Sequence, residues 1–230
     1  MLQLVALHKH FGERHLIRGI SLAVKEGQRI VISGRNGCGK TTLIDIVSGY
    51  SIPDKGLVIY NGKRISNRRP DQIARMGIAR TFQHPRCFHG LSVMHHLMLA
   101  ALSLSKYGLS QIAIPPLPDG PRHILDLVAE WITSEMGAGV LTKSANELSY
   151  GQIKLLNFFC VLVRKPALVL LDEPFSGLDR IHRSAMLDLL SNPEIVSPRM
   201  PIIIAEHVTV ASTLTHASVV TIEAGQLQLH

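Results

Sequence analysis

Residues 29–49 read RIVISGRNGCGKTTLIDIVSG and contain the most informative pattern of the chain. Arg29 to Ser33 is a short apolar run that ends at a glycine, which predicts a buried strand. Thr41 to Ser48 predicts a helix, and Gly49 is well placed to stop it. A strand, a glycine-rich loop and a helix in this order predict the start of a βα unit in an α/β fold.

The loop between them fits the pattern G-x-x-x-x-G-K-[ST]. Glycines let backbone N–H groups curl around phosphate oxygens, and the positive end of the following helix adds to the attraction. Lys40 is expected to reach the β- and γ-phosphates, and the Thr41 hydroxyl to bind Mg²⁺. The pattern arises by chance in on the order of one chain in a hundred. The expected nucleotide contacts are Gly34, Arg35, Asn36, Gly37, Cys38, Gly39, Lys40, Thr41 and Thr42.

A second apolar run, Leu168 to Leu171, ends in the carboxylates Asp172 and Glu173. Asp172 is expected to hold Mg²⁺ through a water, opposite the Thr41 hydroxyl. Glu173, one residue further, is expected to orient and deprotonate the attacking water. Taken alone, such a strand end is more often the start of a solvated loop, so its weight comes from the motifs around it.

Composition sets the limits within which these motifs are interpreted. The 230 residues are 46% hydrophobic and 18% charged, enough for one large domain or two small ones. The net charge of +7 favours a polyanionic neighbour, although ordinary cytosolic proteins are often basic too. Three cysteines form no disulfide framework and suit a reducing compartment. Met1 to His10 is no signal peptide, and no apolar run reaches the ~20 residues of a membrane span, so we expect a soluble chain.

Further motifs follow in a fixed order from Phe11 to His207, and together they resemble the ATP-binding-cassette (ABC) family. They are the aromatic Phe11, Gln83 in RTFQ, the signature LSYGQ at residues 148–152, the D-loop SGLD at residues 176–179, and His207 after the strand-like run 202–205. Coincidence does not account for so many motifs standing in the order that this family has. The chain is thus identified as a member of that family, with one cassette and no internal repeat.

The resemblance implies a fold and a division of labour. The fold is a P-loop (RecA-like) α/β core at residues 1–83 and 147–230, with an N-terminal antiparallel β region and an α-helical subdomain at residues 84–146. Glu173, His207, Lys40 and Gln83 would act in ATP hydrolysis, and Gln83 would join Thr41 and Asp172 at Mg²⁺. Phe11 would stack on adenine.

The resemblance also implies partners. Two cassettes would face head to tail, with each ATP between one phosphate loop and the other subunit's signature motif. Ser149 and the Gly151 amide would contact the γ-phosphate held by that second ABC ATPase subunit, the same chain or a different one. Tyr150, Gln152 and Asp179 complete this expected surface. Transmembrane permease subunits would hold the cassette at the cytoplasmic face of the inner membrane, and no nucleic acid is expected.

Tyr150 stands where the commonest signature has glycine. Import ATPases for branched-chain amino acids often carry an aromatic residue there, and the stretch from Arg80 to Ala100 resembles them closely. Two features depart from that subfamily: the chain ends soon after Gly225, and residues 175–179 follow the general family pattern. Import of amino acids or similar small polar solutes is therefore the favoured function. An exporter or lipid-extracting ATPase, or an iron–sulfur assembly factor, remains the alternative.

The remaining features have modest interpretations. The segment from His84 to His96 carries metal-ligating residue types, but we expect it to meet the membrane subunit, with Val93, Leu97 and Met98 as apolar contacts. Cys160 and Trp131 are expected to pack in the interior. Four prolines predict a loop at residues 114–121. Further strands are expected at residues 57–60, 167–171, 202–205 and 219–222.

Overall fold

The computed structural model describes residues 1–102, 119–207 and 217–229. These residues form two compact units. The first unit comprises residues 1–83, 167–175 and 198–230, and the second comprises residues 84–166 and 176–197. The break after Gln83 lies where the sequence places the start of the helical subdomain. Residues 147–166 and 176–197, which we assigned to the core, group with the helical part instead.

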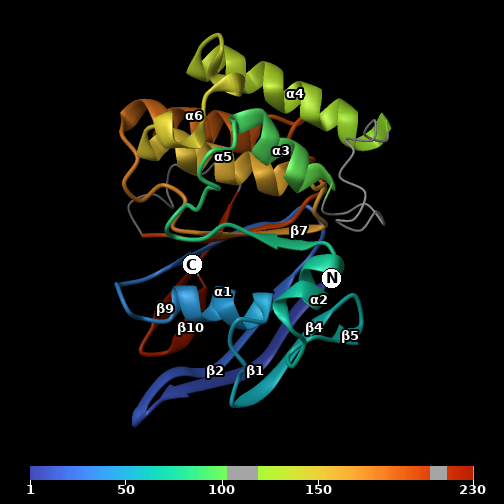
Figure 1. Ribbon diagram of the computed structural model, residues 1–230. Coiled ribbons are helices and arrows are strands. Elements are labelled where there is room, and N and C mark those ends of the chain that lie inside the picture. Colours follow the sequence, from blue (N-terminus) through green and yellow to red (C-terminus); the bar gives the residue numbers. More distant parts are fainter. Residues whose placement is uncertain (103–118, 208–216, 230) are drawn as a thin grey trace. The chain divides into compact units, whose positions relative to one another are not determined.

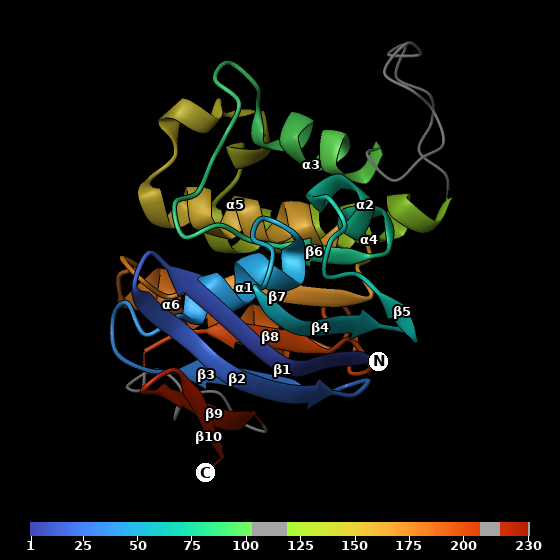
Figure 2. The same ribbon diagram turned by 90° about the horizontal axis from the view of Figure 1, so that it is seen from below.

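The first unit contains two β-sheets, seen in Figure 1 and, turned, in Figure 2. The antiparallel sheet has the order β2-β1-β4-β5, built from β1 (Leu2–Phe11), β2 (Arg14–Val24), β4 (Lys55–Tyr60) and β5 (Lys63–Arg64). The larger sheet has the order β10-β9-β3-β8-β7-β6 and is parallel except for β10. Its strands are β3 (Arg29–Ser33), β6 (Ile78–Arg80), β7 (Leu168–Asp172), β8 (Ile202–Ala205), β9 (Ser218–Glu223) and β10 (Gln226–Leu229).

Helix α1 (Lys40–Ser48) and the shorter α2 (Pro70–Arg75) complete this unit. The apolar side of α1 joins residues from both sheets in one hydrophobic core. Gly49 adopts φ 81° after the helix, and a side chain there would lie 2.6 Å from the Arg68 carbonyl oxygen. The predicted strand, helix and stop around the phosphate loop are therefore confirmed.

The second unit is helical. It contains α3 (Val93–Leu102), α4 (Asp119–Met136), α5 (Tyr150–Leu162), α6 (Arg180–Ser191) and the 3₁₀ turns η2 (Val140–Thr142) and η3 (Ala145–Glu147). The predicted packing role of Trp131 is confirmed, because its ring lies 5.1 Å from that of Phe159. Cys160 is only partly exposed, and burial raises the pKa of its thiol to about 12.

Two expectations for this unit are wrong in part. Of the predicted loop at residues 114–121, residues 114–118 lie outside the described part, whereas residues 119–121 already belong to α4. Proline is tolerated in the first turn of a helix because the N–H it lacks has no helical partner there. Val93 and Leu97 are fully buried and cannot offer an apolar contact to another protein. Between residues 84 and 102, where the structure describes every residue, Phe88 and Leu99 are large hydrophobic side chains that are exposed.

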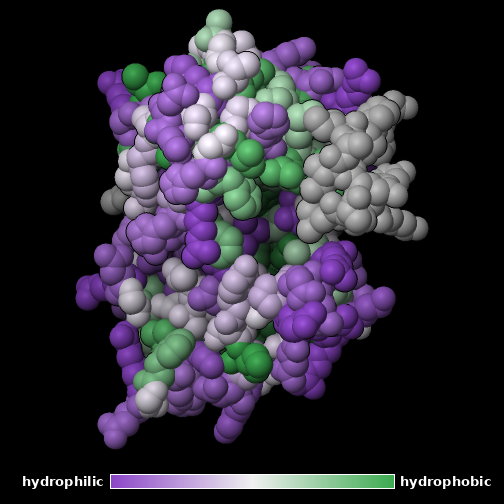
Figure 3. Space-filling view, in the orientation of Figure 1, coloured by the Kyte–Doolittle hydropathy of each residue, from purple (hydrophilic) through white to green (hydrophobic). Residues whose placement is uncertain are grey.

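The visible face in Figure 3 is mostly hydrophilic, with smaller hydrophobic groups between polar side chains. The larger exposed hydrophobic side chains include Phe11, Tyr50, Ile52, Phe88 and Ile181. Among the residues described, no helix is both long and apolar enough to cross a membrane.

Candidate functional site

The phosphate loop follows directly from β3. Lys40 is buried, and its ammonium group donates hydrogen bonds to the carbonyl oxygens of Gly34 (2.8 Å) and Arg35 (3.2 Å). Gly39 precedes α1 with φ 115°, a left-handed conformation that favours glycine. Arg35, Asn36 and Gly37 are exposed. The loop thus presents its outer residues and the N-terminal end of α1 to a phosphate group.

Thr41 and Asp172 meet although they are far apart in the sequence. The Thr41 hydroxyl donates to Asp172 Oδ1 at 3.0 Å. Asp172 ends β7 and is only 1% exposed. Burial raises the pKa of Asp172, while the Thr41 hydrogen bond and the Arg80 charge act in the opposite direction. Both residues supply oxygen atoms, the ligand type that Mg²⁺ prefers, so this predicted pair fits a magnesium ion.

Glu173 sits just beyond the strand in a constrained conformation. Its φ is 47°, uncommon for a residue with a side chain, and its N–H donates to the Ala205 oxygen at 2.9 Å. Gln83 Nε2 donates to Glu173 Oε2 at 2.8 Å. Strained residues that persist in a fold cluster at active sites. The structure therefore brings together Gln83 and Glu173, which the motifs had placed 90 residues apart.

The predicted His207 lies at the same edge of the sheet, two residues beyond the end of β8. Its N–H donates to Glu206 Oε1 at 3.0 Å. Glu206 is almost fully buried, and its other oxygen accepts from the Phe175 N–H at 3.1 Å. Sequence reasoning missed Glu206, although an acidic residue at the end of an apolar strand was the available signal. The Glu206 carboxylate thus holds two backbone N–H groups, that of Phe175 shortly after Glu173 and that of His207.

Arg80 is a second residue that the motifs did not reveal. Its guanidinium donates to Asp45 Oδ1 at 2.6 Å and to the Ser48 hydroxyl at 2.8 Å, both on α1. It also reaches Asp172 Oδ2 at 3.4 Å. The rings of Tyr50 and Phe82 lie 5.1 Å and 4.6 Å from its central carbon, and the side chain is 8% exposed. Arg80 therefore connects α1 with the carboxylate that faces Thr41.

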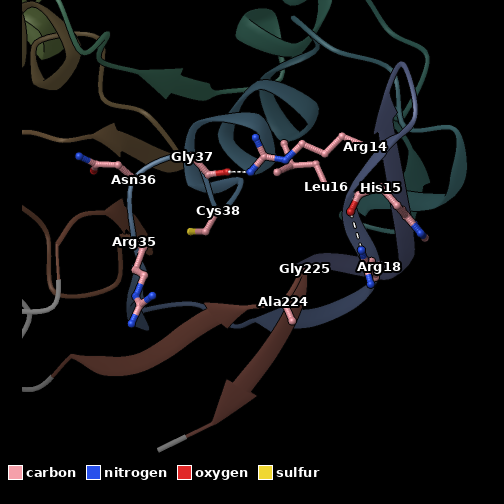
Figure 4. A pocket seen from close by; sticks show the side chains of 10 residues that line it. All are labelled: Arg14, His15, Leu16, Arg18, Arg35, Asn36, Gly37, Cys38, Ala224 and Gly225. Atoms are coloured by element: carbon pink, nitrogen blue, oxygen red, sulfur yellow. Dashed lines mark hydrogen bonds between the residues drawn. The ribbon is translucent and has the colours of Figure 1, made fainter.

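A pocket of about 310 Å³ opens beside the phosphate loop, as Figure 4 shows. Its walls come from the start of β2, the phosphate loop and the β9–β10 turn, and include Arg14, His15, Leu16, Arg18, Arg35, Asn36, Gly37, Cys38, Ala224 and Gly225. Arg14 Nη2 donates to the Gly37 oxygen at 2.8 Å, which ties the β1–β2 hairpin to the loop. Phe11, at the end of β1, is not part of this wall.

Phe11 is 54% exposed, and the Lys9 ammonium lies 5.5 Å from its ring centre. An exposed ring can stack on any base, since stacking ignores the hydrogen-bond pattern. We expect Phe11→Ala to weaken ATP and GTP binding alike by ~1–3 kcal/mol. Fluorescent-nucleotide titration measures both affinities. Unchanged affinities would assign Phe11 no part in binding, and a thousandfold preference for ATP would argue against simple stacking.

Cys38 offers a chemical probe of the same region. Its side chain is partly exposed and lines both this pocket and a neighbouring one formed with residues 221–224. Accessible thiols react and buried ones do not, so we expect a maleimide to inactivate ATP hydrolysis and Mg-ATP to protect. Peptide mapping by mass spectrometry checks the site. Labelling confined to Cys87, with Cys38 unmodified in the nucleotide-free chain, would contradict the expectation.

The predicted signature and D-loop residues lie in the second unit. Ser149 is the N-cap of α5: its hydroxyl accepts from the Gln152 N–H at 3.3 Å, and Gln152 Oε1 accepts from the Ser149 N–H at 2.9 Å. Asp179 caps α6 in the same manner, accepting from the His182 N–H at 2.9 Å. Tyr150 is exposed, whereas Gly151 is buried. These residues therefore begin helices, whatever else they contact.

Within the first unit, the geometry defines a class of protein. A phosphate loop, a Thr–Asp pair suited to Mg²⁺ and a carboxylate held beside it form the site of a P-loop nucleoside triphosphatase.

The comparisons with known proteins name the family. The sequence profile of the ABC transporter family matches residues 17–176, so this chain belongs to that family. It is an ATP-binding subunit that hydrolyses ATP. The chain is 30% identical over 193 residues to the high-affinity branched-chain amino acid transport ATP-binding protein LivG of Salmonella typhimurium, covering 83% of this chain and 76% of that one. It is 29% identical over 170 residues to a probable LivG of Methanocaldococcus jannaschii, covering 74% of this chain and 66% of that one.

Solved structures agree with the fold. A nucleotide-free ATP-binding cassette from an ABC transporter superposes with a TM-score of 0.77 at 25% identity, covering 99% of this chain and 89% of that chain. A dimeric cassette bound to ADP and Pi in a post-hydrolysis state superposes with a TM-score of 0.78 at 19% identity, covering 100% and 98%. The predicted family and fold class are thus confirmed.

Proposed function

We propose that this chain powers the import of branched-chain amino acids or similar small polar solutes. Hydrolysis would occur where Thr41, Asp172, Glu173 and Gln83 come together, and this cluster is the observation that carries the proposal. The similarity to LivG proteins and the aromatic Tyr150 in the signature support the choice of cargo.

The reaction uses the chain's own groups in definite roles. Lys40 and the phosphate-loop amides would bind the β- and γ-phosphates. Glu173 would accept a proton from water as the water oxygen bonds to the γ-phosphorus, and the bond from that phosphorus to the β–γ bridging oxygen would break, giving ADP and phosphate. Thr41, Asp172 and Gln83 would hold Mg²⁺, which neutralises charge on the phosphates. Gln83 also positions Glu173 through the hydrogen bond already described.

The proposed assembly contains two cassettes and membrane-spanning permease subunits at the cytoplasmic face of the membrane. Ser149 and Gly151 would contact ATP bound by the facing cassette, with Tyr150, Gln152 and Asp179 around them. Small residues permit close approach to a phosphate, which supports placing the N-terminal end of α5 there. The second cassette is either a copy of this chain or a related one.

Phe88 is the strongest candidate for contact with the permease. Its side chain is 65% exposed, while its N–H donates to His96 Nε2 at 2.8 Å. His96 is buried, and its Nδ1 pairs with the Ser92 oxygen at 2.8 Å, so both ring nitrogens support the backbone here. An apolar side chain on a fixed backbone suits a protein interface.

The test is capture of the complex from solubilised membranes with a tagged chain, followed by mass spectrometry and solute uptake. We expect permease subunits and ATP-dependent uptake of branched-chain amino acids. Phe88→Glu should abolish capture and uptake while ATP binding remains, and Ile52→Glu, another exposed apolar residue, should preserve all three. Export activity, or soluble iron–sulfur assembly partners in place of permeases, would contradict the proposal.

A further inference from the structure

Lys154 is a buried charged residue on α5. It is 6% exposed, and its ammonium donates to the Ser176 carbonyl oxygen at 2.6 Å. A buried charge is costly unless polar groups satisfy it, so this contact fixes the position of that carbonyl. Helix α5, which begins in the signature motif, thereby holds Ser176, the first residue of the D-loop (residues 176–179).

Tyr150 makes a second contact between the same segments. A methyl group added at Gly177 would lie 3.0 Å from Tyr150 Cε1, so the ring packs directly on this glycine. Gly177 has φ 71°, a conformation that a larger residue adopts only with strain. The Lys154 ammonium lies 5.7 Å from the centre of the Tyr150 ring. The aromatic residue that replaces the commonest signature glycine therefore touches the D-loop of its own chain.

His182, on α6, makes a third contact between the same segments. A methyl group added at Gly151 would lie 2.6 Å from His182 Cγ, so the imidazole covers the signature glycine. Its Nδ1 lies 2.8 Å from both carboxylate oxygens of Asp179. Asp179 also accepts a hydrogen bond from the His182 backbone N–H. This backbone bond and, to a smaller extent, the bond from the imidazole lower the pKa of Asp179. The imidazole thus stands between the signature glycine and the last residue of the D-loop.

We propose that Lys154, Tyr150 and His182 are positioning residues that lock the D-loop onto the signature motif. The two segments then form one preshaped surface, which engages the facing ATP as a unit. The lock rests on contacts within this chain, whereas its consequence for ATP engagement rests on the proposed function. All of these contacts lie within the second compact unit, which also contains residues 176–197.

Amide hydrogen exchange on the nucleotide-free chain tests the lock without requiring a dimer. We expect Lys154→Met to speed exchange at Gly177 to Arg183 by about 10-fold, the effect of losing one hydrogen bond from a charged donor. Lys154→Arg, which can still donate to Ser176, should restore the protection. Asp188→Asn, an exposed change on α6, should leave it unaltered. Exchange within twofold of wild type in Lys154→Met would overturn the proposal.

The second arm measures ATP-dependent association in chains that also carry Glu173→Gln. Adding Lys154→Met or His182→Ala should weaken association about 10-fold, as expected for residues coupled to a shared interface, while ATP affinity of the single chain stays constant. Association of parental strength, together with unaltered exchange, would refute the lock. If the Glu173→Gln parent fails to associate, the proposed function fails, and the exchange result alone decides the lock.

Discussion

Glu173→Gln is expected to lower the ATP hydrolysis rate by ~10²–10⁴-fold, the usual cost of removing a general base. The substitution keeps the size of the side chain and its place beside Gln83, but it removes the proton acceptor and one negative charge. ATP binding should survive, because the phosphate loop with Lys40 and Thr41 is unchanged. A steady-state phosphate-release assay measures the rate, and equilibrium dialysis measures the affinity.

Glu26→Gln is the matched control, since Glu26 is an exposed carboxylate in the turn before β3. It should retain the parental rate. Near-normal hydrolysis by Glu173→Gln would mean that the base lies elsewhere. Asp172→Asn differs from both variants, because replacing the negatively charged carboxylate by a neutral amide should weaken Mg²⁺ binding and, with it, ATP binding as well as turnover.

Arg80→Met is expected to lower the free energy of unfolding by ~3–5 kcal/mol, the cost of leaving a buried charge without its partner. The variant leaves Asp45 and Asp172 without the guanidinium and removes the cation held between Tyr50 and Phe82. Urea denaturation followed by circular dichroism measures the change.

Replacing Asp45 together with Arg80 tests the mechanism of that loss. Arg80→Met combined with Asp45→Leu should regain part of the stability, because the double variant no longer leaves the Asp45 carboxylate without its partner. Arg69→Met, at an exposed pair with Asp71, should cost no more than ~1 kcal/mol. If Arg80→Met lowers the free energy of unfolding by less than ~1 kcal/mol, the ion pairs of Arg80 with Asp45 and Asp172 contribute no stability.

The sequence was sufficient to predict the local structure around the phosphate loop. A run of β-branched residues, three glycines and an amphipathic helix leave few backbone alternatives, so the strand at residues 29–33 and the stop at Gly49 match the structure. The pairing of Thr41 with Asp172 could also be anticipated, because parallel strands bring their carboxyl ends to one edge.

Contacts that depend on tertiary packing could not be predicted. Arg80 precedes Gln83 by three residues, and nothing local indicates that it turns toward α1. Val93 was expected on the surface, but helical periodicity does not say which face meets the core, and the residue is buried. The contacts of Lys154 and His182 likewise depend on how α5 and α6 pack, which no motif specifies.

We expect ATP held by this site to join two cassettes through their signature motifs. Light scattering of the Glu173→Gln chain, with and without ATP and Mg²⁺, measures this association as a change in molecular mass. ATP with Mg²⁺ should double the 25.3 kDa mass, or join the chain to the second cassette recovered with it from membranes. Adding Ser149→Arg should abolish the association, since a bulky side chain cannot fit against a γ-phosphate. If ATP leaves the mass unchanged in both preparations, or if the association survives Ser149→Arg, ATP does not join the cassettes through the signature motif.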